Sequence, residues 1–190
     1  MRTRTFQWLF LLGVSALVVA ACSRRSQGDA FRPTATIKDL MDAEVDKSAD
    51  TLWDSVATIV SKEGTEEKQP RTDEEWANVR HAAITLVEAT NLLVMDGRKV
   101  AKPGERAENP DVELGPEEIE KVLNDDRAAW VNFAHGLQDA AMKALKATDA
   151  KNAQELSDAG EGIDEACEMC HLKYWYPNSK QAAEIKKKQS

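Results

Sequence analysis

Two cysteines and a histidine lie together near the end of the chain, in the order Cys167-Glu168-Met169-Cys170-His171. Two residues between the cysteines, followed at once by histidine, fit the C-x-x-C-H pattern of haem attachment. This spacing lets both sulfurs reach the two vinyl groups on one edge of a haem, while the imidazole turns under the ring to meet the iron. The pattern therefore predicts one covalent haem c, held by Cys167 and Cys170, with His171 as the proximal axial ligand.

Three other interpretations of the cysteine pair have to be weighed. A thioredoxin-like redox pair needs a βαβ context, and the sequence has none. A structural zinc site needs four ligands, usually from a second C-x-x-C or H-x-H pair, and the chain lacks one. A disulfide between Cys167 and Cys170 in an oxidising compartment stays open.

The start of the chain has the features of an export signal. Arg2 and Arg4 precede an apolar run over residues 9–20, which is shorter than the about 20 residues that span a bilayer. Residues 19–22 (Val-Ala-Ala-Cys) resemble the lipobox of bacterial lipoproteins, which implies that the Cys22 thiol takes a diacylglycerol and becomes the mature N-terminus. An ordinary cleaved signal with an incidental cysteine, or an uncleaved anchor, are the alternatives.

The chain therefore divides into four predicted parts. They are a signal peptide (1–21), a lipidated cysteine with a polar tether (22–35), a haem-binding domain (36–177) and a polar tail (178–190). Two or more acyl chains at Cys22 would anchor the protein stably to a membrane. We expect it on the periplasmic side of a bacterial membrane, and Ser23 after the modified cysteine leans towards the outer membrane.

Composition favours helices and a protein partner. The net charge is −8 over 190 residues, which argues against nucleic acid and suits basic redox partner proteins. Alanine, leucine and charged residues dominate, and runs of β-branched residues are scarce. Beyond the haem motif we find no nucleophile–base pair and no phosphate loop, so the sequence predicts no enzyme.

Apolar residues at steps of three and four predict four long helices. The expected helices cover residues 36–62, 72–97, 116–145 and 148–176. A break at residues 46–50, capped by Asp46 or Ser48, is the alternative for the first. Gly64 fits its end, Thr72 with Glu75 forms a capping box for the second, and a long loop covers residues 98–115. Without strand signals, the sequence predicts an all-α fold, an antiparallel four-helix bundle with C-x-x-C-H near the end of the last helix.

This arrangement resembles the class II c-type cytochromes, which comprise cytochrome c prime and its low-spin relatives. The resemblance covers residues 36–176, and residues 167–174 (CEMCHLKY) are its specific part. It implies that His171 is the proximal ligand, and that a residue of the first helix lies on the distal face. A basic residue usually follows the tyrosine in that family, whereas Trp175 stands here.

Met41 is the distal ligand candidate that the resemblance implies. A methionine thioether would raise the haem potential, whereas core filling is its ordinary role. We interpret Met95 and Met142 as core or edge residues. His81 and His135 are expected to face solvent, as are Arg80 and Arg127 unless they pair with haem propionates, and Trp53, Trp76 and Trp130 are expected to pack in the core.

Two functions follow from these expectations, with a third as their contrast. The first is a membrane-anchored monohaem cytochrome that carries single electrons. The second is a five-coordinate haem protein that binds a diatomic gas such as nitric oxide, in which Met41 does not ligate. The third is a haem-free structural lipoprotein. A homodimer is an expectation drawn from the family alone.

Overall fold

The computed structural model describes residues 31–189, and a boundary between two units of the chain lies between Arg32 and Pro33. The predicted export signal and the lipidation site Cys22 lie outside the described residues. Within the second unit, the described elements are α2 (Ile37–Leu40), the π-helix η1 (Met41–Val45), α3 (Asp46–Ser55), β1 (Ala57–Ser61), β2 (Gly64–Lys68), α4 (Asp73–Leu93), α5 (Pro116–Asp125), α6 (Arg127–Asp149), α7 (Ala153–Tyr174) and α8 (Lys180–Gln189).

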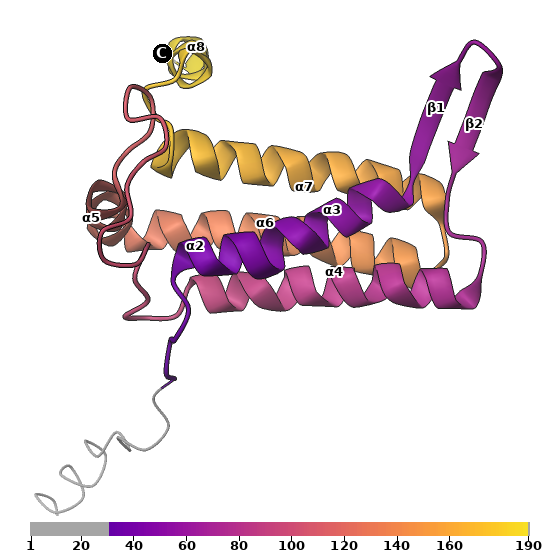
Figure 1. Ribbon diagram of the computed structural model, residues 1–190, viewed down its shortest axis with the longest axis horizontal. Coiled ribbons are helices and arrows are strands. Elements are labelled where there is room, and N and C mark those ends of the chain that lie inside the picture. The colour runs from indigo at the N-terminus through magenta and orange to yellow at the C-terminus, as the bar shows by residue number, and fades with distance from the viewer. Residues whose placement is uncertain (1–30, 190) are drawn as a thin grey trace, which may run out of the picture. The chain divides into compact units, whose positions relative to one another are not determined.

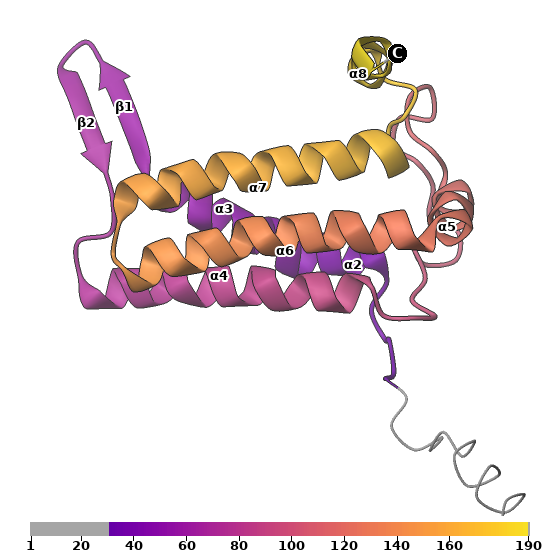
Figure 2. The ribbon, with the colours of Figure 1, turned by 180° about the vertical axis from the view of Figure 1, so that it is seen from behind.

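Four antiparallel helical rods make the body of this unit (Figure 1). Residues 37–55, in which α2, η1 and α3 follow one another without a break, form what we call the first rod. It packs on α4 and α7, and α6 lies against both α4 and α7, as Figure 2 shows from behind. The predicted helical bundle is therefore confirmed. None of the helices in residues 31–189 is both long and apolar enough to cross a bilayer.

Small residues allow the rods to approach closely. Ala83, Ala141 and Ala144 are completely buried, and they alternate with larger side chains such as Leu86 and Ile163, which are buried to the same degree. Full burial of one leucine or isoleucine contributes roughly 1.5–3 kcal/mol to the free energy of unfolding. A continuous stripe of such residues along α4, α6 and α7 therefore holds the bundle together.

Helix starts follow the chemical signals in the sequence. The Thr72 hydroxyl accepts from the Glu75 amide, and the Glu75 carboxylate accepts from the Thr72 amide at 2.9 Å, so the predicted capping box is confirmed. Pro116 begins α5 after Gly115, also as expected. These caps satisfy amide groups that a helix start leaves without partners.

The expected first helix is wrong at its end. Residues 57–61, taken as helix because their apolar spacing suits one, form β1, which pairs with β2 in an antiparallel hairpin. Three of these five residues are β-branched, which favours a strand. Gly64 lies in the hairpin with φ of 135° instead of ending a helix. The fold is therefore not purely α-helical.

Three other boundaries differ from the expectation. The break at residues 46–50 is absent, because the π-helix continues directly into α3. The third expected helix is two helices, since the Asp126 carboxylate caps α6 by accepting from the Ala129 amide at 3.1 Å. The fourth begins at Ala153 rather than near Thr148, which still belongs to α6. In the predicted polar tail, residues 180–189 form α8.

Candidate haem site

The last two turns of α7 carry all three residues of the predicted attachment motif. Asn152 caps the start of α7 by accepting from the Glu155 amide at 3.1 Å. At the other end, the His171 carbonyl accepts from the amides of Trp175 at 2.8 Å and Tyr176 at 3.0 Å, which ends the helix one turn after the motif. Cys167, Cys170 and His171 therefore lie in the last turns of α7, where hydrogen bonds to the His171 carbonyl hold the helix end.

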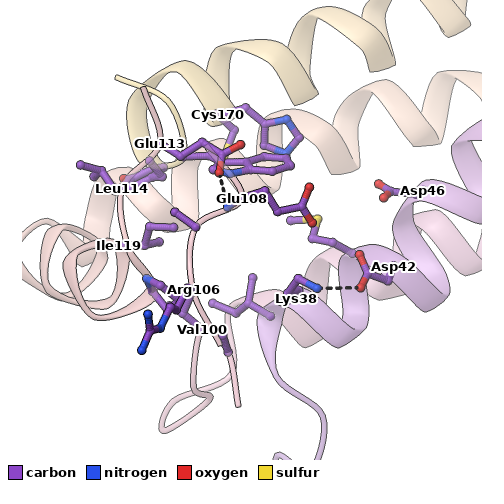
Figure 3. Close-up of a pocket in the computed structure, with 18 of the residues that line it drawn as sticks. Lys38, Asp42, Asp46, Val100, Arg106, Glu108, Glu113, Leu114, Ile119 and Cys170 are labelled. Carbon is purple, nitrogen blue, oxygen red and sulfur yellow. Dashed lines mark hydrogen bonds and ion pairs between the residues drawn. The ribbon is translucent and has the colours of Figure 1, made fainter. Parts of the chain in front are cut away.

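Two cavities lie beside this helix end. The larger has a volume of about 320 Å³ and is shown in Figure 3; Cys170 and His171 line it, with Met41 from the first rod. The smaller has a volume of about 200 Å³, and Cys167 and His171 line it, again with Met41. Cofactor pockets usually measure about 300–1,000 Å³. Because His171 and Met41 belong to both cavities, the two spaces adjoin across the imidazole.

Burial keeps both cysteines in the neutral thiol form. Loss of solvent raises the pKa of the Cys167 thiol to about 11, and the carboxylates of Asp46, Asp164 and Glu168 add to this rise. Burial raises the pKa of the Cys170 thiol to about 12. Neither side chain therefore has the electropositive surroundings typical of a reactive thiolate, as in a thioredoxin-like pair.

The His171 ring is held by aromatic neighbours. Its centroid lies 5.0 Å from that of Trp175 and 5.9 Å from that of Tyr176, both in edge-to-face arrangements. Burial lowers the pKa of His171, while the Glu168 carboxylate opposes this shift. A neutral imidazole is the form that binds a metal, so the surroundings favour ligation. Trp175 serves here as a packing surface for the imidazole.

Met41 is the methionine that lines the same space as His171. It is half-buried and begins η1, and π-helical turns often occur at functional sites. By contrast, Met142 is 49% exposed, and the Met95 sulfur accepts from Arg98 at 3.3 Å. The structure thus brings Met41 together with the motif, and leaves Met95 and Met142 outside both cavities.

The remaining polar candidates lie away from the cavities. His81 and His135 are exposed on helices α4 and α6 and line neither space. Arg80 pairs with Asp149 at 2.6 Å. Arg127 donates to the Val94 carbonyl and to Asp96. Both arginines therefore stabilise helix ends instead of facing a cofactor.

The long loop over residues 98–115 supplies a wall that the sequence did not reveal. At the start of the loop, the Lys99 carbonyl accepts a hydrogen bond from the Ile37 amide at 2.8 Å. The Val100 carbonyl accepts one from the Lys38 amide at 3.0 Å. Its end is fixed where the Leu114 amide donates to the Trp175 carbonyl at 2.8 Å. The only signal in the sequence was the unusual length of the loop.

Three charged side chains of this loop line the larger cavity. They are Arg106, Glu108 and Glu113, and Lys38 of the first rod joins them (Figure 3). The Glu113 carboxylate accepts from the amides of Glu108 and Asn109, each at 2.9 Å, which fixes the loop's shape. Asp42 and Asp46 of the first rod also line this cavity, so charged and apolar side chains both surround it.

Tyr174 gives a test of whether a haem fits this space. It is 3% exposed and lines the larger cavity, yet its hydroxyl has no hydrogen-bond partner. Its ring packs edge-to-face against Trp130 at 5.3 Å and Phe133 at 5.8 Å. An unpartnered buried hydroxyl is unusual in a complete protein interior. Together with the buried thiols and the neighbouring His171 imidazole, it fits a space shaped for a cofactor.

Among the three expected tryptophans, Trp76 and Trp130 are buried core residues, as predicted. Trp53 is only half-buried and lies between α3 and α7, where it lines the smaller cavity. The absence of a side chain at Gly160 admits this indole, whose Cδ1 lies 3.1 Å from where a Cβ would stand. The flat ring that approaches α7 at Gly160 is therefore the Trp53 indole of the protein itself.

No protein-family model and no curated protein sequence matches the chain. Solved structures of cytochrome c prime from Alcaligenes xylosoxidans are similar to it in fold. A ferrous form with a substituted leucine is 16% identical with a TM-score of 0.46, over 75% of this chain and 98% of that one. A nitric oxide complex of another leucine variant gives 16% and 0.47 over the same shares. A ferrous arginine variant with bound nitric oxide gives 17% and 0.44, over 74% and 98%.

Proposed function

We propose that this protein is an exported, membrane-anchored c-type cytochrome that carries single electrons on one haem. The observation that supports this most directly is the meeting of Cys167, Cys170 and His171 at two adjoining cavities, with Met41 facing them from the first rod. The spacing of the three motif residues is that of haem attachment. Their place on a closed helix end would hold such a group rigidly.

Each residue has a distinct role in this proposal. Cys167 and Cys170 would hold the porphyrin through thioether links, His171 would be the proximal ligand, and Met41 would be the distal ligand. The bound haem supplies a one-electron redox couple whose potential depends on its axial ligands and its burial. The apolar walls, Ile37 and Leu114 among them, exclude water from the ring.

Lipidation of Cys22 would place the cytochrome at the periplasmic side of a bacterial membrane. The tether before Pro33 would then keep it near its redox partner proteins, which raises their effective concentration. The acidic net charge of −8 supports basic partners over nucleic acid. Mass spectrometry of the mature N-terminal peptide tests this part, because a diacylglyceryl group on Cys22 gives a defined mass increase.

An optical spectrum tests the haem itself. The chain is produced in a host that matures c-type cytochromes, and the spectrum is recorded oxidised, reduced and reduced with carbon monoxide. We expect a low-spin, six-coordinate spectrum, slow carbon monoxide binding and pigment that stays with the protein after acid extraction. A high-spin spectrum with rapid carbon monoxide binding would instead support the five-coordinate gas binder, in which Met41 is not a ligand.

The matched control replaces both thiols. The double variant C167S/C170S keeps side-chain volume and helix, so it should fold but release any pigment on acid extraction. A wild-type chain that stays colourless despite a working maturation system contradicts the proposal. The Cys167–Cys170 pair would then be a thiol or disulfide pair in a structural lipoprotein.

A further inference from the structure

The hairpin formed by β1 and β2 projects from one end of the bundle (Figures 1 and 2). All ten residues of its strands are exposed, and Ile59 and Val60 are 47% and 77% exposed. An isolated two-stranded hairpin is only marginally stable in water. The hairpin therefore lacks the packing that would normally keep such an element folded.

The two edges of the hairpin differ in charge. The β1 segment, Ala57–Ser61, has no charged residue, whereas β2 carries Glu66, Glu67 and Lys68. Proteins usually protect an open strand edge with charges, proline or a covering element. The β2 edge has this protection and β1 has none. The β1 edge is thus the one suited to pair with another strand.

We propose that β1 pairs antiparallel with β1 of a second copy of this chain, forming a four-stranded sheet across a two-fold axis at Ile59. Two β1 strands can pair without electrostatic repulsion, because β1 has no charged side chain. Two β2 edges would instead place their acidic side chains against each other. The hairpin projects away from its own bundle in both views, so the second bundle would lie beyond the hairpin tip (Figures 1 and 2).

The register of the hairpin supports an axis at Ile59. Ser61 and Gly64 close a two-residue turn and are a hydrogen-bonded pair, and bonded and non-bonded pairs alternate along an antiparallel ladder. The backbone groups of Thr58 and Val60 consequently face the open edge. With the two-fold axis at Ile59, the backbone groups of Thr58 in each copy form hydrogen bonds with those of Val60 in the other copy. The two Ile59 side chains then form a non-hydrogen-bonded pair, in which side chains are closest.

The same register brings opposite charges together. Lys62, at the exposed tip of one hairpin, falls opposite Val56 of the second copy. Val56 lines a groove of about 400 Å³ at the hairpin base, together with Trp53, Glu161 and Asp164. The ammonium group of each Lys62 would thus lie beside a groove that two carboxylates line, a setting that attracts a cation. This complementarity argues for a second copy over an unrelated strand.

Disulfide trapping in the full chain tests the axis. In the pairing proposed, the Cα atoms at position 59 lie about 4.5 Å apart, within the range of a disulfide. Ile59→Cys should give a dimer of twice the mass on a non-reducing gel. Glu66→Cys is the matched control, since residue 66 pairs with Ile59 inside the hairpin but lies on the far strand. Wild-type chain shows the background from its own cysteines.

The outcomes are decisive in both directions. Preferential dimer at position 59 supports the proposal, while equal yields at 59 and 66, no dimer at 59, or an adduct of another mass overturns it. Lys62→Glu in the Ile59→Cys chain should lower the yield about two- to fivefold, and adding Glu161→Lys should restore it. A dimer yield that neither Lys62→Glu nor Glu161→Lys changes overturns this register. The haem spectrum, recorded alongside, reports separately on the proposed function.

Discussion

The indole nitrogen of Trp53 donates a hydrogen bond to the Gly160 carbonyl at 3.0 Å, and so joins the first rod to α7 across 107 residues of sequence. A Cβ at position 160 would lie 3.1 Å from Trp53 Cδ1 and 3.5 Å from Nε1. Contacts of this kind force a ring to move. The glycine is therefore required by the approach of the indole and not by its own backbone conformation.

Gly160→Ala should lower the free energy of unfolding by about 1 kcal/mol. Overpacking costs roughly 1–3 kcal/mol, and the better helix propensity of alanine returns up to about 1 kcal/mol. Gly136→Ala is the control, because α6 has open space there and only the propensity gain should appear. Urea unfolding of both variants measures the difference. A stabilised Gly160→Ala variant would show that Trp53 moves aside freely.

Acid should weaken the start of the first rod through Asp39. A hydrogen bond from Lys102, followed by one from the Thr36 amide, lowers the pKa of Asp39 from 3.8 to about 2. Because the folded pKa is below the unfolded one, this contribution is complete above about pH 4 and is lost as the pH falls towards 2. The loop over residues 98–115 loses an anchor at the same time.

Asp39→Asn tests this dependence. Urea midpoints measured between pH 6 and pH 2 should converge for the wild type and Asp39→Asn at the acid end, because protonation removes the same interaction. Lys102→Met removes the largest cause of the lowered pKa of Asp39. In a Lys102→Met background, Asp39→Asn should therefore change the urea midpoint at pH 6 by less than it does in the wild type. Parallel profiles for the wild type and Asp39→Asn, with a constant gap down to pH 2, would exclude this assignment.

Sequence patterns located the features that local chemistry decides. Thr72 with Glu75 and Pro116 after Gly115 marked helix starts, since a capping group acts on amides two or three residues away. The motif at Cys167 likewise predicted a site on the last long helix, since its residues are close together in the sequence. The helix start at Asp126, by contrast, was not predicted, because residues 116–145 follow one apolar pattern, although the Asp126 carboxylate caps α6.

Features that depend on distant partners were not visible in the sequence. The strand at residues 57–61 needs its partner β2, and its apolar spacing also suits a helix. The cavity wall formed by Arg106, Glu108 and Glu113 depends on hydrogen bonds that join the loop to Ile37 and to Trp175. Such contacts join positions far apart in the chain, which periodicity within one segment does not describe.

Tyr174 and Tyr176 should respond in opposite ways to loss of the hydroxyl. The Tyr174 hydroxyl is buried without a partner, so Tyr174→Phe should raise the free energy of unfolding by about 1 kcal/mol. The Tyr176 hydroxyl donates to the Glu168 carboxylate, so Tyr176→Phe should lower it by about 0.5–1.5 kcal/mol. Thermal unfolding of the haem-free C167S/C170S chain compares the two. Destabilisation by Tyr174→Phe in that chain would show that the hydroxyl has a partner there, and would remove one argument for a cofactor in this space.

Replacing Met41 should separate ligation from packing. Leucine has a similar volume, so Met41→Leu should change the free energy of unfolding by less than about 1.5 kcal/mol. If the thioether is a ligand, the same change should convert the spectrum to high spin, lower the reduction potential and allow rapid carbon monoxide binding. Met142→Leu, at an exposed position on α6, is the control and should leave all three unchanged. A Met41→Leu spectrum identical to that of the wild type would place the sulfur off the iron, and two identical high-spin spectra would favour a five-coordinate, gas-binding haem protein.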